Sequence, residues 1–131
     1  MAKRNVLHFT GIGSAFNASF GNTNAYFIDG TTLFMFDCGE SVYARILKLL
    51  RSKRIQRVII IITHLHSDHI GSLGTVLSFC AHVVPKPVDI FYPTRAIERF
   101  LKCIGISDDK YTHHLSVPED WNLSIVPYRV V

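Results

Sequence analysis

The stretch RVIIIITHLHSDHIGSLG, residues 57–74, joins the most apolar run of the chain to its densest group of potential ligands. Residues 58–62 are one valine followed by four isoleucines, a run typical of a strand covered on both faces in an α/β protein. His64, His66, Asp68 and His69 follow directly. We therefore expect a buried strand that presents ligand chemistry at its carboxyl end.

The spacing of these four side chains indicates a metal site. His64, His66 and Asp68 lie two residues apart, so in an extended segment they point to the same side. His69 breaks this period and would approach from the first turn of a helix, which suits a second ion. Imidazole and carboxylate ligands favour Zn²⁺, with Mn²⁺ as an alternative. The competing interpretation is a set of surface histidines with Asp68 as an N-cap, but four such residues in six positions favour metal binding.

Turn and helix signals place the other elements around this strand. Strands are expected at 25–28 and 32–36, joined by a tight turn at Asp29 and Gly30, and the amphipathic spacing that starts at Ser41 predicts a helix. The glycine- and asparagine-rich segment 11–22 reads as a loop. A second helix is expected from Ser67 or Asp68 to Ala81, capped by one of those two residues and closely packed at Gly71 and Gly74. A strand is expected at 88–92, followed by a helix at 95–104 that Thr94 opens and Gly105 ends. One or two further strands are expected at 121–131.

Alternating strands and helices predict an α/β sheet with helical crossovers. In such sheets ligands bind at the carboxyl ends of strands. Asp37 ends the strand at 32–36, so we expect it at the same edge as the histidines. An ordinary turn or N-cap role before the helix at Ser41 is the alternative for Asp37.

Composition narrows the class of protein. The 131 residues suit one domain, and no apolar run is long enough for a membrane span or a signal peptide, so a cytoplasmic protein is expected. Three cysteines without a CxxC pair argue against a disulfide framework. The net charge is +4, and much of the excess lies in residues 45–57, where it suits a solvated helix face as well as RNA.

Three motifs together resemble the metallo-β-lactamase superfamily. They are FTGIGSAFN at 9–17, FDCGES at 36–41 and THLHSDHIGSLG at 63–74. Their order and spacing support the superfamily, and the three motifs together are most similar to those of the ribonuclease Z-like branch, whose members hydrolyse phosphodiesters. The resemblance implies the N-terminal half of an αββα sandwich, with a mixed sheet and helices on one face.

The resemblance also implies roles for the individual residues. His64 and His66 would hold one zinc ion, Asp68 and His69 would hold the second, and Asp37 would orient a ligand from behind. A metal-activated water would be the nucleophile, and Asp68 could take a proton. Phosphodiesters or RNA would be the substrates. Alternatives within the same resemblance are a thioester or lactone hydrolase, or a non-catalytic half-domain used in assembly.

Only the first half of the superfamily pattern is found. We expect residues 1–131 to form an incomplete metallo-β-lactamase-like domain, because each ion would have only two ligands and the chain alone should be inactive or weakly active. His113 and His114 are read as loop residues with a structural role. A half-sandwich also leaves one sheet face apolar, so we expect homo-oligomers or association with another protein through that face. In loop 11–22, backbone amides that meet phosphate oxygens are one interpretation and a plain turn is the other.

Overall fold

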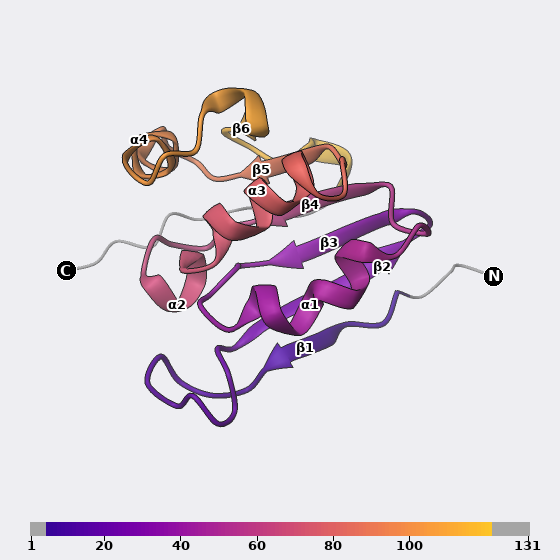
Figure 1. The fold of residues 1–131 in the computed structure, drawn as a ribbon, viewed down its shortest axis with the longest axis vertical. Helices are drawn as coiled ribbons and strands as arrows, with labels where there is room; N and C mark the ends of the chain where they lie inside the picture. Colours follow the sequence, from indigo (N-terminus) through magenta and orange to yellow (C-terminus); the bar gives the residue numbers. More distant parts are fainter. Residues whose placement is uncertain (1–4, 122–131) are drawn as a thin grey trace.

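The computed structural model describes residues 5–121 and shows a six-stranded mixed sheet with helices lying on one face (Figure 1). The strands expected at 121–131 fall outside the described residues, apart from Trp121. The elements are β1 (His8–Gly11), β2 (Asn24–Asp29), β3 (Thr32–Phe36), α1 (Val42–Arg51), β4 (Arg57–Ile61), α2 (Ser67–Ile70), α3 (Leu73–His82), β5 (Val88–Phe91), α4 (Ala96–Cys103), the 3₁₀ turn η1 (Asp108–Lys110), β6 (Thr112–His114) and the 3₁₀ turn η2 (Glu119–Trp121).

The strands lie in the sheet in the same order as in the chain, from β1 to β6. The first three are antiparallel, whereas β3 to β6 are parallel to one another. The predicted turn between β2 and β3 is present, and Gly30 has the positive φ of 60° that such a turn needs. The predicted mixed α/β sheet with helices on one face is therefore confirmed.

Strand β4 is covered on both faces, as its uniform apolar sequence predicts. Val58, Ile60 and Ile62 pack into the main core beneath the helices. Ile59 and Ile61 point to the opposite face and are also buried. The smaller cluster on that face consists of Ile59, Ile61, Phe91, Phe34, Phe36, Val117 and Trp121. Because β4 is central and packed on both sides, its carboxyl end is a rigid base for the residues that follow.

The predicted single helix from residue 67 to 81 is wrong, because the structure divides it into α2 and α3 at Ser72. The Ser72 amide donates to Cys38 O (3.1 Å) and its hydroxyl donates to Gly39 O (2.6 Å). The same hydroxyl accepts from the Tyr43 amide (3.1 Å). These tertiary bonds replace the hydrogen bond to residue 68 that a continuous helix would make. The predicted cap is also wrong, since His66 is the N-cap and Ser67 begins α2.

Residues 112–114 form the edge strand β6, parallel to β5, where the sequence predicts a loop. His113 lies with Nδ1 2.9 Å from Glu98 Oε1 and Nε2 2.8 Å from Tyr92 O. His114 Nε2 contacts Asp89 Oδ1 at 2.8 Å. Both histidines thus tie β6 to its neighbours. Among the helices of residues 5–121, none has the length and apolarity needed to cross a bilayer.

Candidate metal centre

The candidate site lies where the parallel strands β3 and β4 end side by side. The amide of Asp37 donates to Ile61 O (2.8 Å), and the amide of Ile62 donates to Phe91 O (3.1 Å). The sheet hydrogen bonds thus continue one residue past each strand. Beyond Ile62 the chain turns away and enters α2. Asp37, which follows β3, and His64, Asp68 and His69, which follow β4, consequently lie at one edge.

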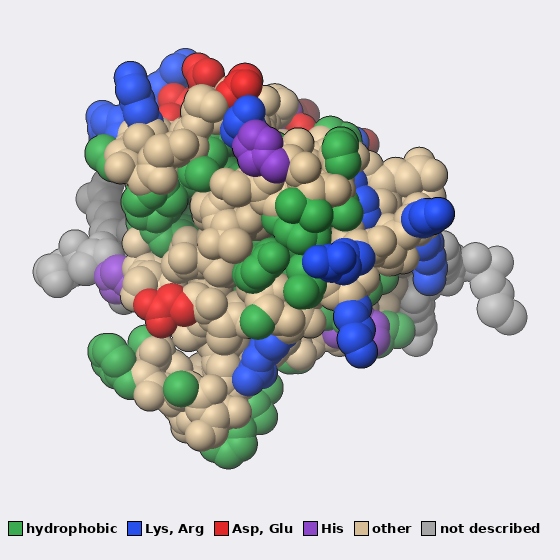
Figure 2. Space-filling model, in the orientation of Figure 1, with side chains coloured by type: hydrophobic (Ala, Val, Ile, Leu, Met, Phe, Trp, Pro, Cys, Tyr) green, Lys and Arg blue, Asp and Glu red, His purple; other side chains and the backbone are tan. Residues whose placement is uncertain are grey.

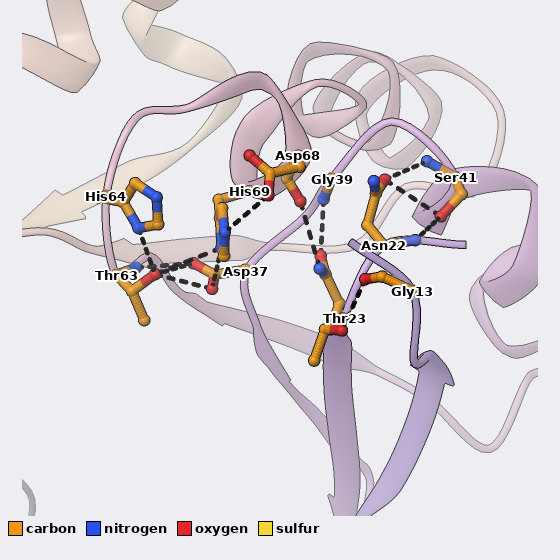
Figure 3. Close-up of polar contacts among 11 residues, drawn as sticks. Gly13, Asn22, Thr23, Asp37, Gly39, Ser41, Thr63, His64, Asp68 and His69 are labelled. Carbon is orange, nitrogen blue, oxygen red and sulfur yellow. Dashed lines mark hydrogen bonds and ion pairs between the residues drawn. The ribbon is translucent and has the colours of Figure 1, made fainter. Parts of the chain in front are cut away.

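His64, Asp68 and His69 come together at this edge (Figure 3). One potential ligand atom from each lies within 4.8 Å of the other two. The rings of His64 and His69 are 3.9 Å apart between centroids. His66 has the extended ψ of 152° that lets the chain change from strand to helix. Asp68 and His69 follow in the first turn of α2, and this brings them back toward His64.

His66 is exposed and stands outside this group. Its ring lies 4.7 Å from that of His64, edge to face. The pairing that the resemblance implies, with His64 and His66 on one ion and Asp68 and His69 on another, differs from this grouping. The structure places His64 with Asp68 and His69 and leaves His66 beside them.

The donor set fits a metal ion. Two imidazoles and one carboxylate are the type and number of protein ligands that catalytic zinc uses, with one position left for water. His69 Nδ1 lies 2.7 Å from Asp37 Oδ2 and must donate there, because a carboxylate only accepts. His69 Nε2 then faces Asp68 Oδ2, 3.1 Å away. Once Nε2 carries no proton, these two atoms are close enough to bind one cation together.

Asp37 is the residue that orients His69. The residue is 5% exposed, and its carboxylate also accepts from the Thr63 amide (2.7 Å) and the Thr63 hydroxyl (2.8 Å). A φ of +65° turns its backbone at the end of β3, a conformation that Asp tolerates better than most residues. The N-cap of α1 is Ser41, so Asp37 does not cap that helix.

The electrostatics of the site favour neutral imidazole at His64. Burial lowers the pKa of His64, and the neighbouring His69 and His66 rings lower it further. Thr63 Oγ1 lies 3.1 Å from His64 Nδ1 and 3.5 Å from His69 Nδ1, so it contacts both histidines. A neutral ring is the form that binds a metal.

Two buried asparagines, which the sequence analysis missed, hold the backbone around the site. Asn24 accepts from the Gly39 amide (2.7 Å) and donates through Nδ2 to Asp68 O (3.3 Å). Asn22 accepts from the amide of Ser41 (2.9 Å), two residues after Gly39 in the loop between β3 and α1. Residues 22–24 read Asn-Thr-Asn, and only the burial of the two asparagines in the fold distinguishes this segment from an ordinary polar turn.

The glycine-rich loop 11–22 folds back on itself. The amides of Ile12 and Gly13 donate to Phe20 O (3.2 Å) and Gly21 O (2.8 Å). Arg45 Nη1 donates to Phe20 O (3.1 Å) from the helix beside it. These amides are already paired, which favours the turn interpretation over phosphate binding. Arg45, the first residue of the basic stretch 45–57, therefore forms a hydrogen bond within the protein.

Replacing Asn24 with leucine should loosen the candidate ligand Asp68. The Gly39 amide and Asp68 carbonyl would lose their partner in a buried setting, at a cost of about 1–3 kcal/mol each in the free energy of unfolding. Metal affinity should fall about 10- to 100-fold, as is typical when an outer partner of a ligand is lost. Titration calorimetry and urea unfolding measure the two effects. Asn17→Leu, in the exposed part of loop 11–22, is the matched control, and equal losses in both variants would contradict the assignment.

Known proteins match the chain over most of its length. A family profile described as Anti-Pycsar protein Apyc1 matches residues 6–104, which include every residue of the candidate site. Ribonuclease Z of Pediococcus pentosaceus is 29% identical over 119 residues, covering 86% of this chain and 38% of that protein. Ribonuclease BN of Proteus mirabilis is 35% identical over 91 residues, covering 67% of this chain and 29% of that protein.

Solved structures show the same fold. Human tRNase Z, short form, superposes with a TM-score of 0.62 at 26% identity, covering 86% of this chain and 46% of that one. The metallo-β-lactamase fold protein YhfI from Bacillus subtilis gives a TM-score of 0.63 at 20% identity, over 82% and 44%, and this likeness concerns the fold alone. The chain spans less than half the length of each of these relatives.

The matches confirm the resemblance predicted from the three motifs, including its restriction to part of the fold. The relatives' names and folds indicate metal-dependent hydrolases. The family match over residues 6–104 covers more than half of the chain. The chain belongs to the family described as Anti-Pycsar protein Apyc1, within the metallo-β-lactamase fold.

Proposed function

We propose that this protein supplies the metal-binding half of a phosphodiester hydrolase, with zinc as the resident ion. The observation that carries the proposal is the convergence of His64, Asp68 and His69 within 4.8 Å, with buried Asp37 behind His69. Surface histidines at a helix start have no need of a buried carboxylate that fixes one ring. A preorganised ligand set of this kind is what metal-assisted hydrolysis requires.

Each residue has a distinct role in the proposed site. His64, Asp68 and His69 hold the ion, and Asp37 keeps His69 with its Nε2 free to bind. Asp68 has two oxygens, so one remains to accept a proton from the attacking water. His66, exposed beside His64, is available for a second ion. The bound metal supplies Lewis acidity and lowers the pKa of water.

Phosphodiesters of RNA are the substrate class that the relatives favour. The names of two of them state ribonuclease activity, and the net charge of +4 suits an anionic substrate. Residues 5–121 offer three ligands in one group. A second ion would lack enough ligands from the described residues, so we propose that turnover by this chain alone is slow.

The His69→Ala variant tests the proposal directly. Titration calorimetry with Zn²⁺ should show binding to the unaltered chain that weakens about 100-fold or more in the variant, since one of three ligands and the Asp37 contact are both lost. Hydrolysis of bis(p-nitrophenyl) phosphate should be slow and should depend on His69. His82→Ala, an exposed histidine at the end of α3, is the control and should change neither quantity.

Two outcomes would count against the proposal. Metal binding that survives the loss of His69 would remove the site from this edge of the sheet. Faster cleavage of a thioester or lactone than of the phosphodiester would leave the metal site in place and would favour the alternative hydrolase class.

A further inference from the structure

A second concave site, with lining residues distinct from the candidate metal centre, lies between α4 and the chain that leads into β6. Its cavity measures about 840 Å³. The lining residues are Arg95, Glu98, Arg99, Lys102, Gly105, Ile106, Ser107, Asp108, Tyr111, Thr112 and His113. We call it the α4 groove. None of the candidate metal ligands lines it.

Three cations form a row along the α4 groove. Arg95, Arg99 and Lys102 are spaced i, i+4 and i+7, so they share one face of the helix. All three are exposed, while Ile97 and Leu101 on the other face are fully buried in the core. Figure 2 shows Lys and Arg side chains gathered over the part of the molecule where Figure 1 places α4.

The acidic residues of the groove leave two of these cations unpaired. Glu98 contacts His113 Nδ1 (2.9 Å) and Arg95 Nη1 (3.7 Å), and the hydrogen bond to His113 lowers the pKa of Glu98. Arg99 and Lys102 form no ion pair with any carboxylate in residues 5–121. Asp108 is the one remaining acid among the lining residues. The groove therefore keeps positive charge that is free to bind an anion.

The row of cations is long enough to contact successive phosphates of a nucleic acid strand. Seven residues of helix separate Arg95 from Lys102, or about 10.5 Å at 1.5 Å per residue. The row is therefore long enough to contact more than one phosphate of a single strand. The hydroxyls of Tyr111 and Thr112 line the same groove and can donate to phosphate oxygens. The concave shape does not suit a flat membrane surface.

We propose that the α4 groove binds the sugar-phosphate backbone of single-stranded RNA. This names a binding surface for the substrate class proposed above and rests on that function. Because α4 follows the carboxyl end of β5, Arg95 begins the row at the sheet edge that carries the candidate metal centre. A strand held along α4 would thus lead toward that edge.

Salt-dependent RNA binding tests the groove separately from catalysis. Fluorescence anisotropy of a labelled single-stranded oligoribonucleotide, measured in EDTA, reports binding with no metal present. Each phosphate contact contributes about 0.7 to the slope of log K against log salt for a single strand. Arg99→Gln combined with Lys102→Gln should therefore reduce the slope by about 1.4. Between 50 and 200 mM salt the unaltered chain should lose about sevenfold more affinity than this variant.

The matched control is Lys53→Gln combined with Arg54→Gln, which removes the same charge from exposed positions after α1. An equal reduction of the slope in the control would overturn the proposal, as would equally strong competition by polyglutamate of the same charge. Intact groove-dependent binding together with absent hydrolysis would contradict the proposed enzyme activity and leave the groove assignment standing.

Discussion

Alanine at position 39 is expected to abolish metal binding and to destabilise the fold by about 3 kcal/mol or more. A Cβ at Gly39 would lie 2.0 Å from Asp68 O and 2.7 Å from Asn22 Oδ1. The first of these atoms is backbone and cannot rotate away. The loop after β3 and the start of α2 would have to separate, which moves Asp68 and His69 out of reach of His64.

Urea unfolding and zinc titration of Gly39→Ala measure both consequences. Gly30→Ala is the control, because a Cβ there meets nothing within 4 Å and only the positive φ of 60° is unfavourable. That variant should lose about 1 kcal/mol of stability and keep its metal affinity. Retention of full zinc affinity by Gly39→Ala would show that Asp68 does not contribute to the site.

Replacing Ile60 with alanine should cost about 3–4 kcal/mol of unfolding free energy. The side chain is fully buried at the centre of β4, beneath the helices, so its removal leaves a cavity that the rigid sheet cannot close. Denaturant unfolding followed by circular dichroism gives the value. Leu115→Ala removes the same number of carbon atoms from a position that is 50% exposed and should cost far less. A small loss at Ile60 would mean that the main core tolerates repacking around β4.

Local sequence predicted the parts of the fold that depend on neighbouring residues. The buried strand at 58–62 was predicted from its uniform apolar sequence. The site after it was predicted from the two-residue spacing of the ligands and the rule that sites form at strand ends. The turn at Gly30 followed from the glycine itself. The same local signals placed Asp37 at the correct edge, where the structure adds its bond to His69.

The features that were missed depend on contacts between distant segments. The break before α3 arises from the bonds of Ser72 to Gly39 and Tyr43, more than 25 residues away. The position of Asn24 depends on Asp68, 44 residues later in the chain. Strand β6 forms because β5 offers it an edge, and nothing within residues 112–114 requires that. The local sequence of a polar or short segment does not reveal which distant segment it will contact.

Association through the second sheet face stays a prediction. That face carries the small cluster of Ile59, Ile61 and Phe91, on which Val117 and Trp121 pack. Phe27 and Phe34 stack beside it, 4.7 Å apart between ring centroids. Light scattering of the purified chain would show whether copies pair through this surface.

The match between strand order and chain order has a consequence for biosynthesis. Each strand pairs with the one made just before it, so the sheet can grow at one edge as the chain leaves the ribosome, without waiting for a distant segment. Every residue of the candidate metal centre precedes position 73. A nascent chain can therefore assemble the ligand cluster before α4 and β6 exist, and the groove between those two elements would form after that cluster.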